Sequence, residues 1–416
     1  MFEIHLRFKR HVLTVIAVVL LVPWLILGSC RSYTYFSGRI RSATGKHTAL
    51  IHEGHSGPWG KLLYTDMVIG VPDEFITLPA PAATNNTWTF KNINRSGVAA
   101  LIRSTDLPPD QIDTLINATP WSTSGNGTVL TPSDSQVLAL TPAARSKIYS
   151  ALLECLGNSE AKDPVWFRPD MLDRMLEKSD LHPASIELLR SLLYRVPGSS
   201  IYFFADTEVA LRQLPDDMER RRFIQLISSK ASLLLRLQVD QSSDVDAMSE
   251  YWGRGGRVKD VLPLMRALQD IENGWDIGLA YLLPPLARDR LYTYPFPNPS
   301  ANVTKEDCFW TAFNMFSTAP DNRFVDMDFV RKTLDKDYFS IYEPSQLGDI
   351  VFLATAEGNV IHAAIHVADD IVFTKNGYHY TQPWLLMHRK DMLETYVARY
   401  PGEGALRFLF FRKLSL

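Results

Sequence analysis

The sequence predicts an α+β protein, with a mainly helical N-terminal region and a smaller C-terminal region in which strands dominate. Between residues 166 and 290, apolar residues recur mostly at helical spacing, whereas residues 349–374 resemble successive strands. Two proline-bearing runs, at 282–287 and 292–299, cannot continue a helix and mark a junction between these regions. Beyond the junction we expect a helix packed on an antiparallel sheet, which is an α+β arrangement.

The chain has 416 residues, which predicts two or three domains. We expect a signal peptide or membrane anchor at 1–30, a mixed region at 31–165, a helical region at 166–290 and a C-terminal domain at 291–416. Hydrophobic content of 46% and charged content of 21% indicate a globular protein. A net charge of -3 without a basic stripe argues against nucleic-acid binding.

The first thirty residues have the pattern of an export signal. Arg7, Lys9 and Arg10 precede an apolar run over 12–27 that is nearly long enough to span a bilayer. Because the basic side stays in the cytoplasm, the rest of the chain is expected outside it, tethered to the membrane. The run ends in a Leu-Gly-Ser-Cys sequence at Cys30, which resembles a bacterial lipoprotein signal box. A lipidated Cys30 and an uncleaved signal anchor both remain open.

Several helices are expected before the junction. Thr141 and Pro142 form a typical helix start, with threonine as the cap and proline in the first turn. Acidic residues at 216–219 suit the N-terminal dipole of a helix that we expect to continue to Leu237. The other expected helices cover residues 96–103, 109–116, 185–194 and 258–271.

The chain has 3 cysteines, which are too few for a disulfide framework. Cys155 lies in an apolar helical stretch and is expected to be buried and inert. Cys308 begins a predicted helix over 308–316. Its reactivity therefore depends on what surrounds it.

Cys308 and His362 occur in the contexts that a thiol nucleophile and its base require. A base and a helix N-terminus both favour the thiolate form of a cysteine. His362 and His366 share one face of a predicted strand, so His366 is a rival base, while Ala363 and Ile365 face the opposite side and pack. A metal site is not expected, because no nearby cysteine or carboxylate has the spacing of a zinc ligand.

These motifs resemble the NlpC/P60 cysteine peptidases over roughly residues 292–400. The matching elements are Asp307-Cys308, the Gly-Asp strand at 348–353 and the histidine strand that begins at His362. The resemblance implies a papain-like fold, with Cys308 as nucleophile and His362 as base, and no metal or organic cofactor. It also implies extracytoplasmic cleavage of peptide bonds, typically in cell-wall peptides.

The resemblance leaves the third catalytic residue open between Thr374, at the family's position, and Asn376, which would match papain's Cys–His–Asn order. Asn376 with Gly377 is also a strong turn signal. Tyr294, Asp307 and His366 lie near positions that shape substrate recognition in the family, and they are candidate substrate-binding residues. The family's usual Ser-Gly after the Asp-Cys pair is Phe-Trp here.

Two functions follow from the sequence. The first is an exported, membrane-tethered cysteine hydrolase that cleaves an amide or peptide bond, such as a peptidoglycan-like peptide, through a Cys308 acyl-enzyme. The alternative is a non-catalytic envelope interaction protein, whose N-terminal region binds a partner. The enzyme predicts a Cys308 sulfur and a His362 nitrogen within about 4 Å. The interaction protein predicts a buried Cys308, or an exposed apolar patch larger than about 600 Å² on the N-terminal region.

Overall fold

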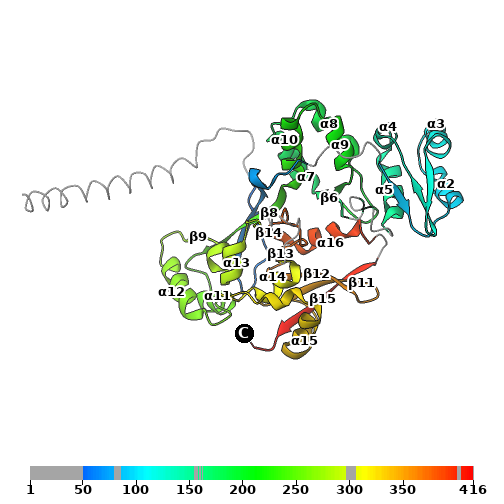
Figure 1. The fold of residues 1–416 in the computed structure, drawn as a ribbon. Coiled ribbons are helices and arrows are strands. Elements are labelled where there is room, and N and C mark those ends of the chain that lie inside the picture. Colours follow the sequence, from blue (N-terminus) through cyan, green and yellow to red (C-terminus); the bar gives the residue numbers. More distant parts are fainter. Residues whose placement is uncertain are drawn as a thin grey trace, which may run out of the picture. The chain divides into compact units, whose positions relative to one another are not determined.

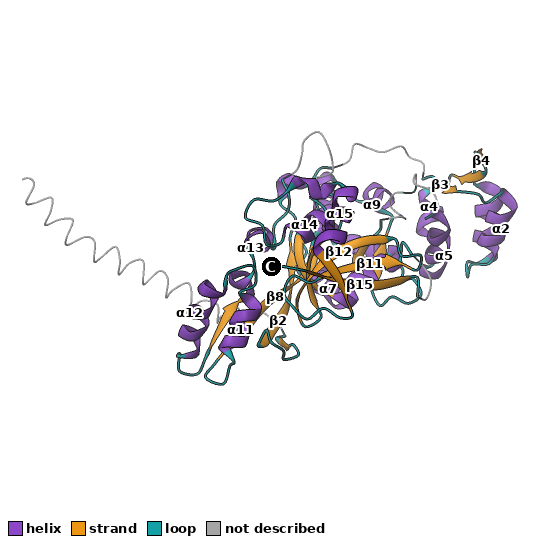
Figure 2. Cartoon of the chain, turned by 90° about the horizontal axis from the view of Figure 1, so that it is seen from below, coloured by secondary structure: helices purple, strands orange, loops and turns teal. Residues whose placement is uncertain are grey.

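Short helices and antiparallel sheets alternate along the chain (Figures 1 and 2). The computed structural model describes residues 50–78, 86–153, 158, 161, 163–296, 306–400 and 404–415. The predicted signal or anchor, including Cys30, lies outside the described residues, and so does Cys155. In the described part of the chain, no helix has the length and apolar character needed to span a membrane. Residues 51–416 form one compact unit.

A six-stranded antiparallel sheet carries the candidate site. Its strand order is β10 (Tyr338–Ile341), β15 (Leu406–Lys413), β11 (Ile350–Thr355), β12 (Val360–Ala368), β13 (Ile371–Lys375) and β14 (Trp384–His388). The helices around it are α14 (Cys308–Asn314), η5 (Asn322–Val325), α15 (Met327–Asp337) and α16 (Arg389–Val397). Helix α14 packs on β12 and β13, as Figure 1 shows.

Alternation along β12 divides two hydrophobic clusters, as the sequence predicts. Ala363, Ile365 and Val367 belong to the cluster that also contains α14. Ala364 belongs to a second cluster on the other face, with Met392 of α16. Because β11, β12 and β13 are covered on both faces, they are buried almost throughout.

A second sheet, whose strands all precede residue 290, shares a core with the C-terminal region. Its order is β1 (His52–Glu53), β2 (Lys61–Ile69), β8 (Lys230–Val239) and β9 (Trp275–Gly278). The elements near it are α11 (Val245–Trp252), α12 (Val258–Gln269), η4 (Leu279–Leu282) and α13 (Pro285–Arg290). Leu237, Trp252 and Trp384 share one core with Cys308. The expected boundary at 290 therefore does not divide two cores.

The expected helix from 215 to Leu237 is wrong in its second half. Helix α10 (Asp217–Ser228) ends where Ser229 adopts an extended conformation, and β8 begins at Lys230. Leu233, Leu235 and Leu237 are buried at every second position, which is the period of a strand rather than a helix. Pairing with β2 along its length then fixes this segment in the sheet.

The N-terminal region combines short helices with two small sheets. Its strands are β3 (Trp88–Phe90), β4 (Trp121–Ser124), β5 (Gly127–Leu130), β6 (Val165–Phe167) and β7 (Tyr202–Phe204). Its helices are η2 (Asp73–Phe75), α2 (Arg95–Arg103), α3 (Pro109–Asp113), η3 (Thr114–Ala118), α4 (Asp134–Leu138), α5 (Pro142–Leu152), α7 (Pro169–Glu177), α8 (Pro183–Leu192) and α9 (Thr207–Gln213), with α10 following. Thr141 caps α5 as expected, because its Oγ1 accepts the Ala144 amide at 3.0 Å.

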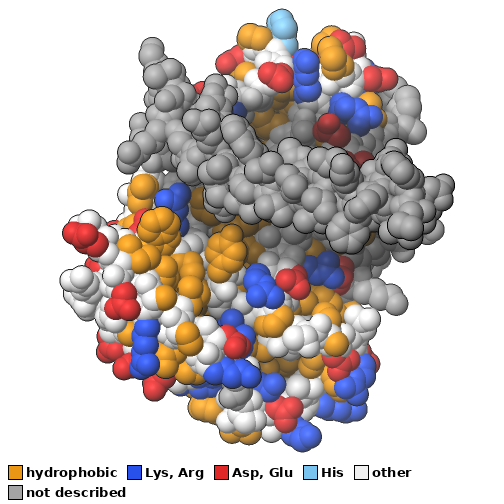
Figure 3. Space-filling model, turned by 90° about the vertical axis from the view of Figure 1, so that its left-hand side faces the viewer, with side chains coloured by type: hydrophobic (Ala, Val, Ile, Leu, Met, Phe, Trp, Pro, Cys, Tyr) orange, Lys and Arg blue, Asp and Glu red, His pale blue; other side chains and the backbone are white. Residues whose placement is uncertain are grey.

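A buried ion pair ties the N-terminal region together. Nε of Arg145 on α5 lies 2.8 Å from the carboxylate of Asp206, and both side chains are buried. The Tyr149 hydroxyl donates to the same carboxylate. On the face of the molecule in Figure 3, by contrast, the visible basic and acidic side chains are interspersed.

Candidate functional site

Cys308 is the first residue of α14, as the sequence predicts. Asp307 caps this helix of 7 residues, and its carboxylate accepts the Trp310 amide at 2.8 Å. The Cys308 side chain belongs to the core cluster that includes Phe352 and Ala363, and only 7% of the residue is exposed. The position of Cys308 at the helix start matches the expectation, but the thiol lies inside the core.

The surroundings of Cys308 favour the neutral thiol. Burial, followed by the charge of Asp307, raises the pKa of Cys308 to about 12. The Ala363 amide and the ammonium of Lys375 act in the opposite direction but are the weaker influences. Lys375 is itself fully buried, and its Nζ donates to the carbonyls of Gly377 at 2.6 Å and His379 at 3.2 Å. Burial lowers the pKa of Lys375 to about 8.

His362 is buried and hydrogen-bonded through both ring nitrogens. Its Nε2 lies 2.9 Å from Thr374 Oγ1, and its Nδ1 lies 2.8 Å from the Tyr396 hydroxyl on α16. Thr374 donates its own hydroxyl proton to the Ala363 carbonyl at 3.0 Å. It follows that His362 Nε2–H donates to Thr374, and that Nδ1 accepts from Tyr396. Burial lowers the pKa of His362 to about 3, so the ring is neutral at pH 7.

The two members of the expected catalytic pair are associated with different faces of β12. Cys308 packs with the face of β12 that carries Ala363, whereas His362 shares its face with Ala364 and bonds to Tyr396 on α16. No hydrogen bond joins Cys308 to His362 in the described part of the chain. The one basic lone pair of the neutral imidazole is occupied by Tyr396. While Tyr396 donates to Nδ1, His362 therefore has no free lone pair to take a proton from Cys308.

The remaining candidate residues have other surroundings. His366 is fully buried, neither of its ring nitrogens has a hydrogen-bond partner among the described residues, and burial lowers its pKa to about 4. Asn376 contacts Met387 Sδ at 3.6 Å and does not bond to His362. The hydroxyl of Tyr294 donates to the Ile69 carbonyl at 3.0 Å, and burial raises its pKa. Of the two proposed third residues, Thr374 is the one beside His362.

Sequence reasoning missed Tyr396 and Lys375. Tyr396 is 34 positions from His362 on a helix of low amphipathicity, so no local spacing connects the two residues. Lys375 follows Thr374 at the end of an apolar strand. A lysine in such a strand is unusual, and this was the sequence signal for a buried lysine. No group of three or more metal-binding side chains could hold a metal ion among the residues that the structure describes.

Comparison with known proteins adds no relative. The chain matches no protein-family model, no curated protein and no solved structure.

Proposed function

We propose that this chain is a non-catalytic interaction protein, in which the C-terminal sheet and α14 form a structural platform. One observation carries the proposal. Both ring nitrogens of His362 are bonded to Thr374 and Tyr396, while Cys308 is buried and shares no hydrogen bond with His362. A buried cysteine and a satisfied sheet histidine are structural features, not parts of an acyl-transfer site.

The energetics favour this interpretation. A thiol with a pKa of about 12 would cost roughly 7 kcal/mol to ionise at pH 7, because each pKa unit corresponds to about 1.4 kcal/mol. Freeing His362 from Tyr396 would add the cost of an unsatisfied buried group, about 1–3 kcal/mol. An efficient thiol hydrolase instead lowers the pKa of its nucleophile with a neighbouring base.

The proposed location is extracytoplasmic, with the chain tethered to a membrane through residues 1–30. This part of the proposal depends on the basic residues, the apolar run and Cys30 of the sequence. Signal anchor and lipidated Cys30 remain alternative tethers. Such a tether would leave residues 51–416 free to bind a partner at the membrane surface.

A thiol hydrolase is the second candidate function, and one observation favours it. Cys308 begins a helix that packs on the strand of His362, and Thr374 on the next strand lies 2.9 Å from that histidine. This is the order that the NlpC/P60 resemblance implies. For hydrolysis, Tyr396 would have to release Nδ1, and the imidazole and thiol would have to meet.

Covalent trapping separates the two candidates. The full chain is treated at pH 7 with a peptidyl vinyl sulfone, papain serves as the positive control, and adducts are located by peptide mapping. We expect no adduct at Cys308 under conditions that label papain completely. An adduct at Cys308 that disappears in His362→Ala would overturn the proposal in favour of the hydrolase.

A further inference from the structure

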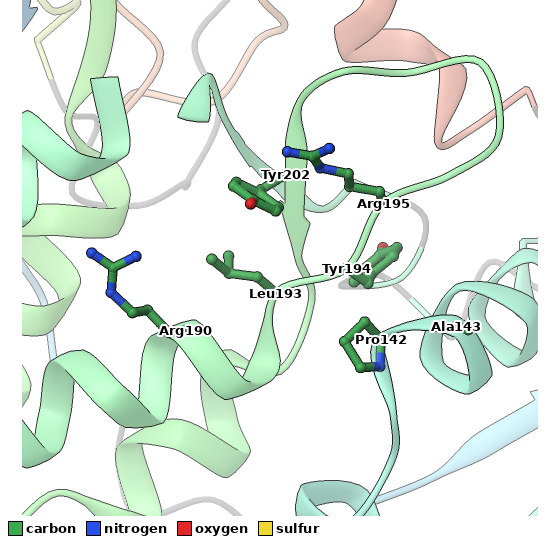
Figure 4. Close-up of a pocket in the computed structure, with 7 residues that line it drawn as sticks. All are labelled: Pro142, Ala143, Arg190, Leu193, Tyr194, Arg195 and Tyr202. Carbon is green, nitrogen blue, oxygen red and sulfur yellow. The ribbon is translucent and has the colours of Figure 1, made fainter. Parts of the chain in front are cut away.

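A surface cavity of about 480 Å³ lies in the N-terminal region, far along the chain from Cys308 (Figure 4). We call it the arginine groove. It is lined by Pro142, Ala143, Arg190, Leu193, Tyr194, Arg195 and Tyr202. These residues come from the start of α5, the end of α8 and the segment leading into β7. Its volume is in the range of cavities that bind small ligands or short peptide segments, about 300–1,000 Å³.

Two arginines give the arginine groove its charge. Arg195 forms no ion pair with a carboxylate of the described residues, and its guanidinium lies over the Tyr202 ring, 4.4 Å from the centroid. Among the described residues, Arg190 pairs only with Asp173, at 3.0 Å, and both side chains are substantially exposed. None of the described residues that line the cavity is acidic. An exposed pair of this kind contributes little and exchanges readily for a ligand.

The start of α5 adds to the same electrostatic effect. Pro142 is the first residue of this helix of 11 residues, and Ala143 is the second. The amide end of a helix carries partial positive charge that favours an anion within the first turn. Arginines and a helix start thus act together, and both favour a negatively charged group.

The rest of the lining is apolar and fixed in position. Leu193 and Tyr194 are buried and belong to neighbouring hydrophobic clusters. The backbone of Tyr194 exchanges two hydrogen bonds with Phe203 of β7, at 3.0 and 2.8 Å. Because the wall is already ordered, a ligand would lose little free energy in organising it.

We propose that the arginine groove binds a carboxylate with an apolar body, of the kind that an acidic peptide segment of a partner protein presents. The planar guanidinium of Arg195 can take a carboxylate through two parallel hydrogen bonds, and Arg190 can take a second. The apolar part of the ligand would contact Leu193, Pro142 and the Tyr202 ring. This inference rests on the proposed interaction function and names the chemistry of the partner. A free organic acid offers the same chemistry from another source.

The test is a fluorescence-anisotropy titration of the full chain. The probe is a fluorescein-labelled Glu-Leu-Glu-Phe-Glu peptide, and the matched control is Gln-Leu-Gln-Phe-Gln. We expect saturable binding of the acidic peptide that weakens about tenfold or more in Arg195→Gln and in Arg190→Gln, since each loses charge-assisted bonds. Arg266→Gln, an exposed arginine on α12, should bind as the parent does. Raising the salt from about 0.05 to 0.5 M should weaken binding.

Competition distinguishes the two sources of the carboxylate. If 3-phenylpropionate displaces the probe with the affinity of the unlabelled peptide, a free organic acid is the ligand class; if it is at least tenfold weaker, the peptide is. Absence of binding, equal binding of the neutral peptide, or binding unchanged in both arginine variants would overturn the site. Cys308→Ala should leave binding unchanged. If the peptide titration fails while Cys308 stays unlabelled, only the arginine groove is ruled out as a site. If Cys308 is labelled, the proposed function is ruled out.

Discussion

Two helix starts in this chain have contrasting surroundings. Helix α14 begins at Cys308, where the core covers the thiol and the nearby His362 is bonded to Thr374 and Tyr396. Helix α5 begins at Pro142, beside a cavity with two arginines on its walls. Near the start of α14, residue types typical of catalysis are buried or hydrogen-bonded to other residues of the protein. Near the start of α5, the two arginines are exposed, so their charge is available to a ligand.

The difference shows that residue type alone does not make a functional site. A helix start stabilises a negative charge only when that charge lies beside the helix end. Burial disfavours the charged form of a side chain more strongly than the helix dipole favours it. At Cys308 burial dominates and raises the pKa of the thiol. At the arginine groove Arg190 and Arg195 are exposed to solvent.

The largest effect is expected beneath the arginine groove. Asp206→Ala leaves the buried guanidinium of Arg145 without its counter-charge, which should lower the free energy of unfolding by about 3–5 kcal/mol. Urea denaturation followed by circular dichroism measures the loss. Asp173→Ala removes the exposed partner of Arg190 and serves as the control, with an expected change below about 1 kcal/mol. Equal effects of the two substitutions would contradict the assigned burial.

A smaller effect is expected at the closed site. Tyr396→Phe removes the hydroxyl that bonds to His362 Nδ1 and leaves that buried nitrogen unsatisfied. We expect the free energy of unfolding to fall by about 1–3 kcal/mol. Tyr342→Phe, at a residue that is 94% exposed, is the matched control and should have no effect. If the free energy of unfolding of Tyr396→Phe equals that of the parent chain, this hydrogen bond does not hold the imidazole in place.

Lowering the pH should reduce the contribution of His362 to the stability of the folded chain. The folded-state pKa of His362 is depressed from 6.5 to about 3, so the unfolded chain binds a proton that the folded chain does not. The contribution of the neutral ring is therefore fully present above pH 6.5 and is lost as the pH falls toward 3. Denaturation midpoints measured between pH 7 and pH 4 should decline less steeply in His362→Gln than in the parent chain.

His388 provides a control of opposite sign. Burial lowers the pKa of His388, but the hydrogen bond to Asp370, at 2.8 Å, and the charges of Asp370 and Asp391 together outweigh burial and raise that pKa. The stability it contributes is present below pH 6.5 and is lost as the pH rises through the raised folded-state value. His388→Gln should thus cost more stability at pH 5.5 than at pH 8. A pH response of the same sign for both histidines would contradict the two environments.

The smallest effect on stability is expected at the arginine groove itself. Arg190→Gln combined with Arg195→Gln changes exposed side chains, so the free energy of unfolding should stay within about 0.5 kcal/mol per substitution. Thermal unfolding measures it beside the peptide titration. Clear destabilisation would mean that the arginines serve the fold and not a ligand.

The sequence predicts local features of this molecule better than long-range ones. The cap of α5 at Thr141, the start of α14 at Cys308 and the alternation along β12 depend on neighbouring residues, and the structure confirms them. The apolar run of β8 does not by itself distinguish a strand from a helix, because its partner, β2, is some 170 positions away.

The candidate site illustrates the same limit. Thr374 could be anticipated beside His362 because the strands are adjacent in sequence. Tyr396 could not, because its contact depends on how α16 packs on the sheet. The alternation along β12 also assigns His362 and Ala363, the residue that packs with Cys308, to opposite faces of the sheet, a consequence that becomes visible only when the positions of α14 and α16 are known. The arginine groove has no sequence motif, since its residues come from three separate segments.

The ionisation of Cys308 tests the central claim most directly. The pH-rate profile of its alkylation by iodoacetamide is measured in the full chain by peptide mapping, beside His362→Ala. The account predicts slow alkylation that rises only at high pH, with a thiol pKa well above the ordinary value of about 8.5 and no response to His362→Ala. A thiol pKa below about 8.5 that rises when His362 is removed would contradict it and establish an activated pair.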